Sequence, residues 1–384
     1  MQRSRERILT THCGSLARPA DLLDLMKLKV NGQPYDGDTY TERVQNAVTE
    51  IVRKQVETGI DIVTDGEQSK PGFFTYVNER LTGFTPKSGA RFSMFADEVA
   101  AFPEYYEEYF RQAMLGGSVA SVVPMACTGP VTYKGQEVLQ QDIDNLKTAL
   151  VGVNPAAVFM PAVAPSGVGT NEYYRTEEEY LYAVAEALRT EYQAIVAAGF
   201  LVQIDDPFLT DVYSDSSLNS TEKHKKAELF VAALNHALRG IPAEKIRFHT
   251  CYGINEGPRV YDAQLKDVLG AMLKVNAGAY SFEAANARHE HEYHLWETVK
   301  LPEGKVIIPG VITHASNIVE HPEFIAERIV RYAKLVGRER VIAGGDCGFS
   351  SQATYHPEVH PTVVWAKFQA MAEGARLATK ELWG

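Results

Sequence analysis

Short apolar segments alternate along the chain with longer segments whose apolar residues recur every three or four positions. The short segments are typical of buried β-strands; they cover residues 8–15, 61–67, 157–167, 201–207, 246–253, 279–286, 306–314 and 341–348. The longer segments are typical of amphipathic helices; they cover residues 41–58, 176–198, 221–239, 263–275, 321–336 and 360–380. This alternation predicts an α/β protein with a parallel sheet.

Eight strand segments favour a closed (β/α)8 TIM barrel, although an open sheet fits the same count. A dinucleotide-binding open sheet is disfavoured because no Gly-x-Gly-x-x-Gly follows the first predicted strand. Residues 84–150 interrupt the repeat and are rich in Phe, Tyr and Glu, which predicts an insertion after the second strand. We therefore expect residues 1–384 to form a single barrel domain that carries this insertion.

Composition and charge restrict the partners of such a barrel. The 384 residues carry 38 Lys and Arg against 49 Asp and Glu, and the net charge of −11 argues against nucleic acids and anionic membrane surfaces. No stretch reaches the roughly 18 apolar residues of a membrane span, and no signal-peptide core is found, so we expect a cytoplasmic protein. Four cysteines are too few for a disulfide framework. The oligomeric state stays open, a homo-oligomer included.

Chemically reactive side chains gather where the predicted strands end. In a parallel barrel these ends lie on one face, which is where the active sites of such barrels are found. Ordinary loops favour Lys, Ser, Asn and Gly, whereas these ends collect His, Cys, Asp and Glu. The residues are Ser15, Glu67, Ser166, Asp205, Asp206, His249, Cys251, Glu283, His314, Asp346 and Cys347. We therefore expect an active site on this face.

The segment His249-Thr250-Cys251 suggests a metal site. Residues i and i+2 of a strand point to the same side, so the imidazole and the thiol can face one ion. Glu283 ends the next predicted strand and Cys347 ends the eighth. One imidazole, two thiolates and a carboxylate suit Zn²⁺, which is tetrahedral and borderline soft. The alternative is a pair of buried thiols beside a hydrogen-bonded histidine.

Other residues with metal-binding or nucleophilic chemistry receive less weight. Cys13 is expected to pack, although a place in the site stays open, and Cys127 in the insertion is expected to be inert. The run from His289 to His294 resembles a metal-binding tract. Charged residues at the start of a helix are usually solvated, so we expect this run to be a solvated surface.

Seven motifs together resemble those of the cobalamin-independent methionine synthases, in their catalytic C-terminal barrel and in the short single-barrel relatives. The motifs are CGS at 13–15, DGE at 65–67, QIDDP at 203–207, HTC at 249–251, YSFE at 280–283, THASN at 313–317 and DCG at 346–348. They occur in the family's order and span nearly the whole chain. The resemblance implies a zinc-dependent enzyme that presents a thiol substrate as a zinc-bound thiolate to a methyl or alkyl donor.

The resemblance also implies roles for single residues. The family's zinc ligands correspond to His249, Cys251, Glu283 and Cys347, the same set that the strand ends indicate. On chemical grounds we expect Glu283 to leave the metal as the substrate sulfur arrives, which keeps the coordination number at four.

The family's substrate contacts correspond to four further residues. Glu67 and Asp205 are expected to hold the amino group of homocysteine, Ser15 to contact its carboxylate, and His314 to donate a proton to the methyl donor.

Three departures from the family pattern concern mainly the methyl donor. The family's large enzyme has a duplicated N-terminal barrel that helps to bind polyglutamyl folate, and these 384 residues do not contain it. The tryptophan that stacks on the pterin is replaced by the segment 169–174, and the first tryptophan of the chain is Trp296. IDEP has become IDDP, with Asp206 in place of Glu. The first two departures weaken the expectation of a folate donor but leave the thiol-activating centre unaffected.

Methylation of homocysteine to methionine is therefore the first expectation. One alternative is an epoxyalkane:coenzyme M transferase, in which a zinc thiolate opens an epoxide; its sulfonate acceptor needs cations, which Arg18, Lys70 and Arg288 could supply. A corrinoid-linked methyltransferase is a second alternative and needs a corrinoid protein as partner. A metal hydrolase is disfavoured by the two cysteine ligands, and a non-enzymatic binding barrel would leave the strand-end chemistry without a purpose.

Overall fold

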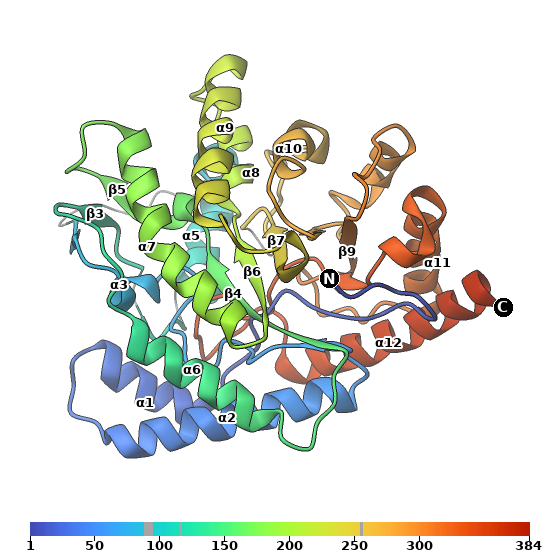
Figure 1. Cartoon of the computed structure of the whole chain (residues 1–384), viewed down its shortest axis with the longest axis horizontal. Coiled ribbons are helices and arrows are strands. Elements are labelled where there is room, and N and C mark those ends of the chain that lie inside the picture. The colour runs from blue at the N-terminus through green and yellow to red at the C-terminus, as the bar shows by residue number, and fades with distance from the viewer. Residues whose placement is uncertain (88–94, 115–116, 121, 254–255) are drawn as a thin grey trace.

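The computed structural model describes residues 1–87, 95–114, 117–120, 122–253 and 256–384. A parallel sheet forms its centre, and helices surround this sheet (Figure 1). The sheet has the strand order β1-β4-β6-β7-β8-β9-β10. These strands are β1 (Ile62–Val63), β4 (Ala157–Val163), β6 (Leu201–Asp205), β7 (Ile246–Thr250), β8 (Ala279–Phe282), β9 (Val306–Ile312) and β10 (Gly344–Gly345).

The segment around Thr10 closes the barrel between the first and last strands of this sheet. Thr10 forms a parallel bridge with Ala343, and the amide of Thr11 donates to the Ala343 carbonyl at 2.8 Å. On the other side, the amides of Asp61 and Ile62 both donate to the Thr10 carbonyl at 3.1 Å. Through these bonds the segment around Thr10 takes the place of the eighth strand of a (β/α)8 barrel. The predicted fold class is therefore confirmed, and the open sheet is excluded.

The helices pack around the outside of the barrel. They are α1 (Ala20–Val30), α2 (Gly37–Glu57), α3 (Val77–Arg80), α4 (Ala96–Ala101), α5 (Pro103–Tyr109), α6 (Gln136–Ala149), α7 (Glu177–Ala197), α8 (Phe208–Ser214), α9 (Ser220–Ala237), α10 (Leu265–Met272), α11 (Pro322–Val336) and α12 (Pro361–Trp383). The six predicted helices correspond to α2, α7, α9, α10, α11 and α12. None of the helices in the described part of the chain combines the length and the hydropathy needed to cross a bilayer.

Short helical turns complete the connections between these elements. A π-helical turn covers Phe110–Met114, and 3₁₀ turns cover Pro165–Gly167, Ala243–Lys245, Glu290–Glu297 and Arg338–Arg340.

The chain between β1 and β4 contains the range 84–150 that the sequence marks as an insertion. Within it, β2 (Phe84–Pro86) and β3 (Met125–Cys127) pair with each other and, through β3, with β5 (Thr170–Asn171) in a separate small sheet. The last part of the range is α6, which packs against α2 and α7 as the crossover helix between β1 and β4. Residues 88–94, 115–116 and 121 of the range lie outside the described residues.

The side chains inside the barrel change from apolar to polar along the strands. An apolar cluster at the amino ends consists of Leu9, Ile62, Phe159, Leu201, Ala279, Val306, Ile308 and Ile342. Further along, Arg247 of β7 lies over the ring of Phe159 and donates to the hydroxyl of Thr11 at 3.0 Å. Because alternate residues of a strand face the same side, the next inward positions are Asp205 of β6 and His249 of β7, which are register partners. The strand ends thus carry polar side chains to one face.

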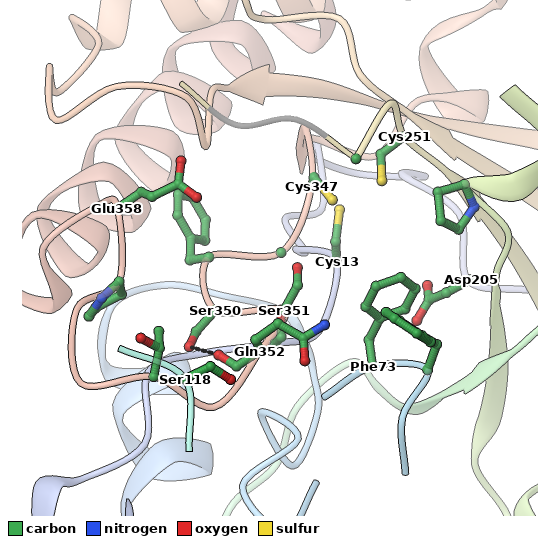
Figure 2. Close-up of a pocket in the computed structure, with 18 of the residues that line it drawn as sticks. Cys13, Phe73, Ser118, Asp205, Cys251, Cys347, Ser350, Ser351, Gln352 and Glu358 are labelled. Carbon is green, nitrogen blue, oxygen red and sulfur yellow. Dashed lines mark hydrogen bonds between the residues drawn. The ribbon is translucent and has the colours of Figure 1, made fainter. Parts of the chain in front are cut away.

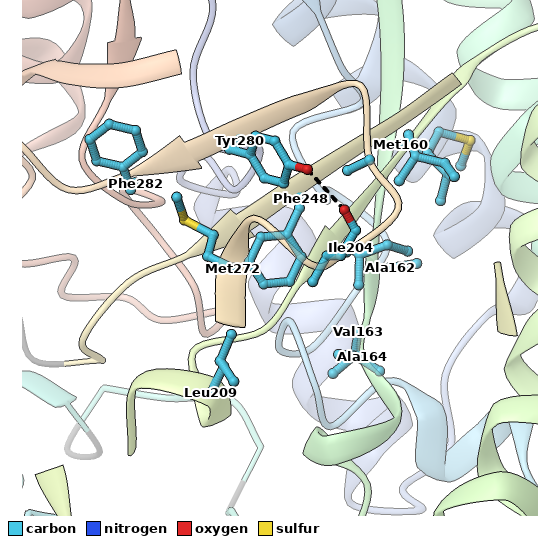
Figure 3. Packing of buried hydrophobic residues seen from close by; sticks show 14 of the residues in the cluster. Met160, Ala162, Val163, Ala164, Ile204, Leu209, Phe248, Met272, Tyr280 and Phe282 are labelled. Carbon is cyan, nitrogen blue, oxygen red and sulfur yellow. Dashed lines mark hydrogen bonds between the residues drawn. The ribbon is translucent and has the colours of Figure 1, made fainter. Parts of the chain in front are cut away.

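The outward positions of the same strands form the main apolar core beneath the helices (Figure 3). Phe248 of β7 and Tyr280 of β8 pack there with Met272 of α10, and the Tyr280 hydroxyl donates to the carbonyl of Val275 at 2.9 Å. Each fully buried side chain of this size contributes about 2 kcal/mol through the hydrophobic effect. This packing holds β7 and β8 in place and so fixes the positions of the side chains at their ends.

Candidate metal centre

Three of the predicted zinc ligands form one buried group. His249 lies in β7, Cys251 follows the end of β7, and Cys347 follows β10. One potential ligand atom from each lies within 4.8 Å of the others. Figure 2 shows the sulfur atoms of Cys13, Cys251 and Cys347 pointing into the same part of a cavity. The structure therefore brings together an imidazole and two thiols, as the spacing at the strand ends predicts.

The His249 ring is held in the orientation of a metal ligand. Its Nδ1 lies 3.3 Å from the hydroxyl of Ser281, which is its register partner on β8. Its Nε2 is buried and has no hydrogen-bond partner in the described part of the chain. Burial lowers the pKa of His249 to about 3, so the ring is neutral, which is the form that binds metals. A buried nitrogen without a partner costs about 1–3 kcal/mol, and a metal ion would satisfy it.

The two thiols of this group are suited to a cation. The hydrogen bond that Cys251 donates to Cys347, together with burial, raises the pKa of Cys251 well above its ordinary value. For Cys347 the bond with Cys251 lowers the pKa, but burial and neighbouring negative groups outweigh this and the pKa is raised. Sulfurs in such surroundings ionise when a doubly charged ion binds them. The donor set of one imidazole and two thiols thus fits Zn²⁺.

Glu283, the fourth predicted ligand, lies next to this group but is bound by other residues. Its Oε1 accepts from the amide of Tyr252 at 3.0 Å. Its Oε2 accepts from Arg259 Nη2 at 2.7 Å and from Asn286 Nδ2 at 2.8 Å. The negative charge of Glu283 raises the pKa of both Cys251 and Cys347. Glu283 therefore influences the two thiols electrostatically from a neighbouring position.

His314 lies with Glu283 and Asp346 in a second buried group, whose potential ligand atoms are also within 4.8 Å of one another. His314 does not line the cavity described below, as far as the described residues show. Neither of its ring nitrogens has a hydrogen-bond partner among those residues. Burial lowers the pKa of His314 to about 3. Asp346 accepts from the amides of Ala284 and Ala285 at 2.7 Å and so fixes the loop after β8.

A cavity of about 350 Å³ opens at the carboxyl ends of the strands beside the His249 group. Its wall contains the three predicted substrate residues, Ser15, Glu67 and Asp205, as well as His249, Cys251 and Cys347. Cys13, which the sequence assigns mainly to packing, also lines it, and its thiol donates to the Gly345 carbonyl at 3.1 Å. The cavity therefore joins the candidate metal ligands to the predicted substrate contacts.

Glu67 and Asp205 form an electrostatically coupled carboxyl pair. Burial raises the pKa of Glu67, while Lys70 and Arg18 lower it. Burial, together with the charge of Glu67, raises the pKa of Asp205 well above its ordinary value. The Oε2 of Glu67 is buried without a hydrogen-bond partner among the described residues. A positively charged group between these two carboxyls would stabilise the charge on both.

The three cations proposed from the sequence as sulfonate ligands are bound elsewhere. Arg18 donates to main-chain carbonyls, among them that of Ser350. Lys70 donates to the Pro161 carbonyl at 2.6 Å, and Arg288 donates to a carbonyl at the surface. Within the described part of the chain, neither Lys nor Arg lines the cavity.

Sequence reasoning missed the ion pairs that extend outward from Glu283. Arg259 also donates to Asp262 at 2.8 Å, and Asp262 lies 3.0 Å from His289. The expectation of a solvated run is wrong for His289, which is buried between Asp262 and Glu292. Burial lowers the pKa of His289, but these two hydrogen bonds outweigh it and raise the pKa to about 9. Two of its pairs, Arg259 with Asp262 and His289 with Glu292, are three residues apart in the sequence. The contacts that join these pairs to each other and to Glu283 link separate loops and have no local sequence signal.

Fold and site together define a class: a (β/α)8 barrel with soft metal-ligand side chains at the carboxyl ends of its strands. The family model for the catalytic domain of cobalamin-independent synthases matches residues 8–364, and the chain belongs to this family. The resemblance seen in the sequence motifs is thus confirmed.

Named relatives agree with this assignment. The chain is 24% identical over 375 residues to a methionine synthase of Saccharolobus solfataricus, covering 97% of this chain and 95% of the relative. A methionine synthase of Sulfurisphaera tokodaii is 23% identical, with 97% and 93% covered.

Two solved structures share the fold. A B12-independent methionine synthase from Shewanella sp. W3-18-1, in complex with selenomethionine, superposes with a TM-score of 0.75 at 21% identity, covering 98% of this chain and 99% of that one. A putative vitamin-B12-independent methionine synthase from Listeria monocytogenes gives a TM-score of 0.67 at 20% identity with the same coverage. At these identities the likeness concerns the fold alone.

Proposed function

We propose that the protein is a zinc-dependent methyltransferase that converts homocysteine to methionine. Family membership and the named relatives support methyl transfer to this thiol. The observation that carries the proposal is the single cavity that joins the His249, Cys251 and Cys347 group to the carboxyl pair of Glu67 and Asp205. One end of this cavity suits a thiol, and the other suits an amine.

The proposed zinc ligands are His249, Cys251, Cys347 and Glu283. A bound Zn²⁺ would lower the pKa of a substrate thiol from its ordinary value of about 8.5, so that the sulfur is ionised at neutral pH. Ser281 keeps Nε2 of His249 directed away from β8 by holding Nδ1. Arg259 holds Glu283 beside the thiols, where its carboxylate would be available as a metal ligand.

The remaining contacts orient the amino acid. Glu67 and Asp205 would bind its ammonium group, which adds to the positive charge of Lys70 and Arg18 near this buried carboxyl pair. Ser15 is buried in the cavity wall and would bind the carboxylate through its hydroxyl. His314 is the proposed proton donor for any methyl donor whose leaving group requires a proton. It would act from beside Glu283.

The charges on the cavity wall favour homocysteine over coenzyme M as the acceptor. A sulfonate needs cationic partners, and the described wall carries the carboxyls of Glu67 and Asp205 but neither Lys nor Arg. An ammonium group has the complementary charge.

A binding comparison tests this choice. Calorimetry on the zinc-loaded protein should show at least tenfold tighter binding of homocysteine than of coenzyme M, and Asp205→Asn should reduce the difference. Asp144→Asn on the exposed face of α6 is a matched control that should leave the ratio unchanged. Tighter binding of coenzyme M would overturn the proposal.

A further inference from the structure

Three phenylalanines form an aromatic wall in the same cavity. Phe73 and Phe74 follow β1, and Phe208 begins α8. The centroid of the Phe73 ring lies 5.0 Å from that of Phe74 and 6.4 Å from that of Phe208, and the Phe74 and Phe208 centroids are 6.1 Å apart. Figure 2 shows Phe73 on the same side of the cavity as Asp205. An apolar, ring-lined surface therefore adjoins the proposed homocysteine site.

A carboxylate lies beside this aromatic wall. Asp211 lines the cavity and is three residues beyond Phe208 on α8, so both side chains lie on one face of that helix. It is exposed where it lines the cavity, and its carboxylate makes no hydrogen bond or ion pair with any residue that the structure describes. Although Asp211 is open to the cavity, the surrounding protein shields it from bulk water; this desolvation and the charge of Asp206 raise its pKa to about 7, against a smaller lowering by Lys226. A nearby cation would stabilise its charged form.

The described cavity wall contains several carboxyl groups but neither Lys nor Arg. Glu67, Asp205, Asp211 and Glu358 line it, whereas no Lys or Arg does so in the described ranges. A polyglutamyl folate, which carries several carboxylates, would meet charge of its own sign. Aromatic faces beside a carboxylate are the usual surroundings of sulfonium and quaternary ammonium groups in proteins.

We infer that the methyl donor is an onium compound, a methyl sulfonium or a quaternary methylammonium, whose cationic centre lies against Phe73, Phe74 and Phe208 and faces Asp211. This inference rests on the proposed function, because it names the second substrate of the same site.

The chemistry of such a donor balances without a further reactant. The ionised sulfur of homocysteine attacks the methyl carbon, and a new S–C bond forms as the bond from that carbon to the onium atom breaks. The electron pair of the broken bond stays on the leaving atom, which departs as a neutral thioether or tertiary amine. The leaving group of such a donor does not need a proton. This agrees with the cavity wall, because His314, the proposed proton donor, is not among the described residues that line it. Because opposite charges disappear in this reaction, an apolar wall favours it.

Binding of a matched pair of probes tests the charge requirement. Choline and 3,3-dimethyl-1-butanol have the same shape and differ in the positive charge. Calorimetry on the zinc-loaded protein with homocysteine should show at least tenfold tighter binding of choline. Phe208→Leu and Asp211→Asn should each weaken choline binding about tenfold, whereas Asp144→Asn, on the exposed face of α6, should not change it. Equal binding of the two probes, or no effect of Asp211→Asn, would overturn the inference.

Methyl transfer supplies the second readout. Deuterated trimethylsulfonium should give labelled methionine and dimethyl sulfide, while 5-methyltetrahydrofolate triglutamate should give at least 100-fold less methionine. If the folate is the better donor and homocysteine still adds a sulfur ligand to zinc, the onium inference fails and the proposed function stands. If homocysteine adds no such ligand, the proposed function itself fails.

Discussion

The Oε2 atom of Glu283 lies 2.7 Å from Nη2 of Arg259, and both side chains are buried. Arg259 has a φ of 57°, which is unusual for a residue other than glycine, and it also binds Asp262. The arginine therefore neutralises two buried carboxylates and keeps one of them next to the thiols. In the proposed function, this pairing would let Glu283 bind zinc without being permanently committed to it.

Replacing Arg259 should show this role. Arg259→Gln leaves buried carboxylates without their cation, which typically costs about 3–5 kcal/mol. We expect the free energy of unfolding of the metal-free protein to fall by about that amount, and zinc to restore part of it by binding Glu283. Urea denaturation with and without zinc measures both effects. Arg288→Gln, at a surface arginine, is the control; an equal loss with and without zinc would contradict the assignment.

The position of Ser15 can be tested through a neighbouring glycine. A Cβ at Gly348 would overlap the Ser15 hydroxyl, so Gly348→Ala must displace it. If Ser15 binds the carboxylate of homocysteine, the variant should raise the KM for homocysteine about tenfold, as Ser15→Ala should. The double variant should be no worse than either single one, because both remove the same contact. An unchanged KM for homocysteine in Ser15→Ala would show that Ser15 does not bind the substrate.

Asp206, the residue that departs from the family's IDEP motif, has a structural role in this chain. Its Oδ1 accepts from the Ser166 hydroxyl at 2.8 Å and from the amide of Leu209 at 3.1 Å, in the first turn of α8. Asp206→Ala should therefore lower the free energy of unfolding by about 1–2 kcal/mol and loosen the start of α8. Asp206→Asn keeps an acceptor oxygen and should cost less. Chemical denaturation that ranks the two variants in the opposite order would refute this role.

The buried His289 should make stability depend on pH. The pKa of His289 is raised to about 9 in the folded protein, against about 6.5 when unfolded. The stabilisation from its charged form is thus fully present below pH of about 6.5 and is lost as the pH rises through about 9. It is on the order of 3 kcal/mol.

Denaturation of the protein and of His289→Gln at several pH values separates this effect from the titration of carboxyls such as Asp211. The difference in unfolding free energy between the two proteins should shrink between pH 6.5 and 9. A constant or growing difference would contradict the ion pairs that surround His289.

Periodicity was sufficient to predict the alternating strands and helices, because each is encoded locally, but it did not decide whether the sheet closes. The pairing around Thr10, by contrast, was uncertain until the structure showed its bonds with Ala343 on one side and Ile62 on the other. The helix α6 was missed although Leu139, Ile143 and Leu146 form a buried stripe on it, since it lies within the expected insertion.

The site was predictable where chemistry follows from position along a strand. His249 and Cys251 face the same way because they are two residues apart, and Cys347 meets them because parallel strands end at one face. The pairing of Glu283 with Arg259 was not predictable, since it depends on the path of a loop. The aromatic wall was missed for the same reason: Phe73 and Phe208 are 135 positions apart and meet only in the folded chain.

Zinc K-edge X-ray absorption of the zinc-loaded protein tests the central claim most directly. The resting spectrum should fit two sulfur ligands, from Cys251 and Cys347, with nitrogen and oxygen completing the set at about 2.0–2.3 Å. Homocysteine should add a third sulfur, whereas Cys347→Ser should lose one sulfur and Cys127→Ser should lose none. An unchanged spectrum on addition of homocysteine, or full zinc–sulfur coordination in Cys347→Ser, would contradict the account.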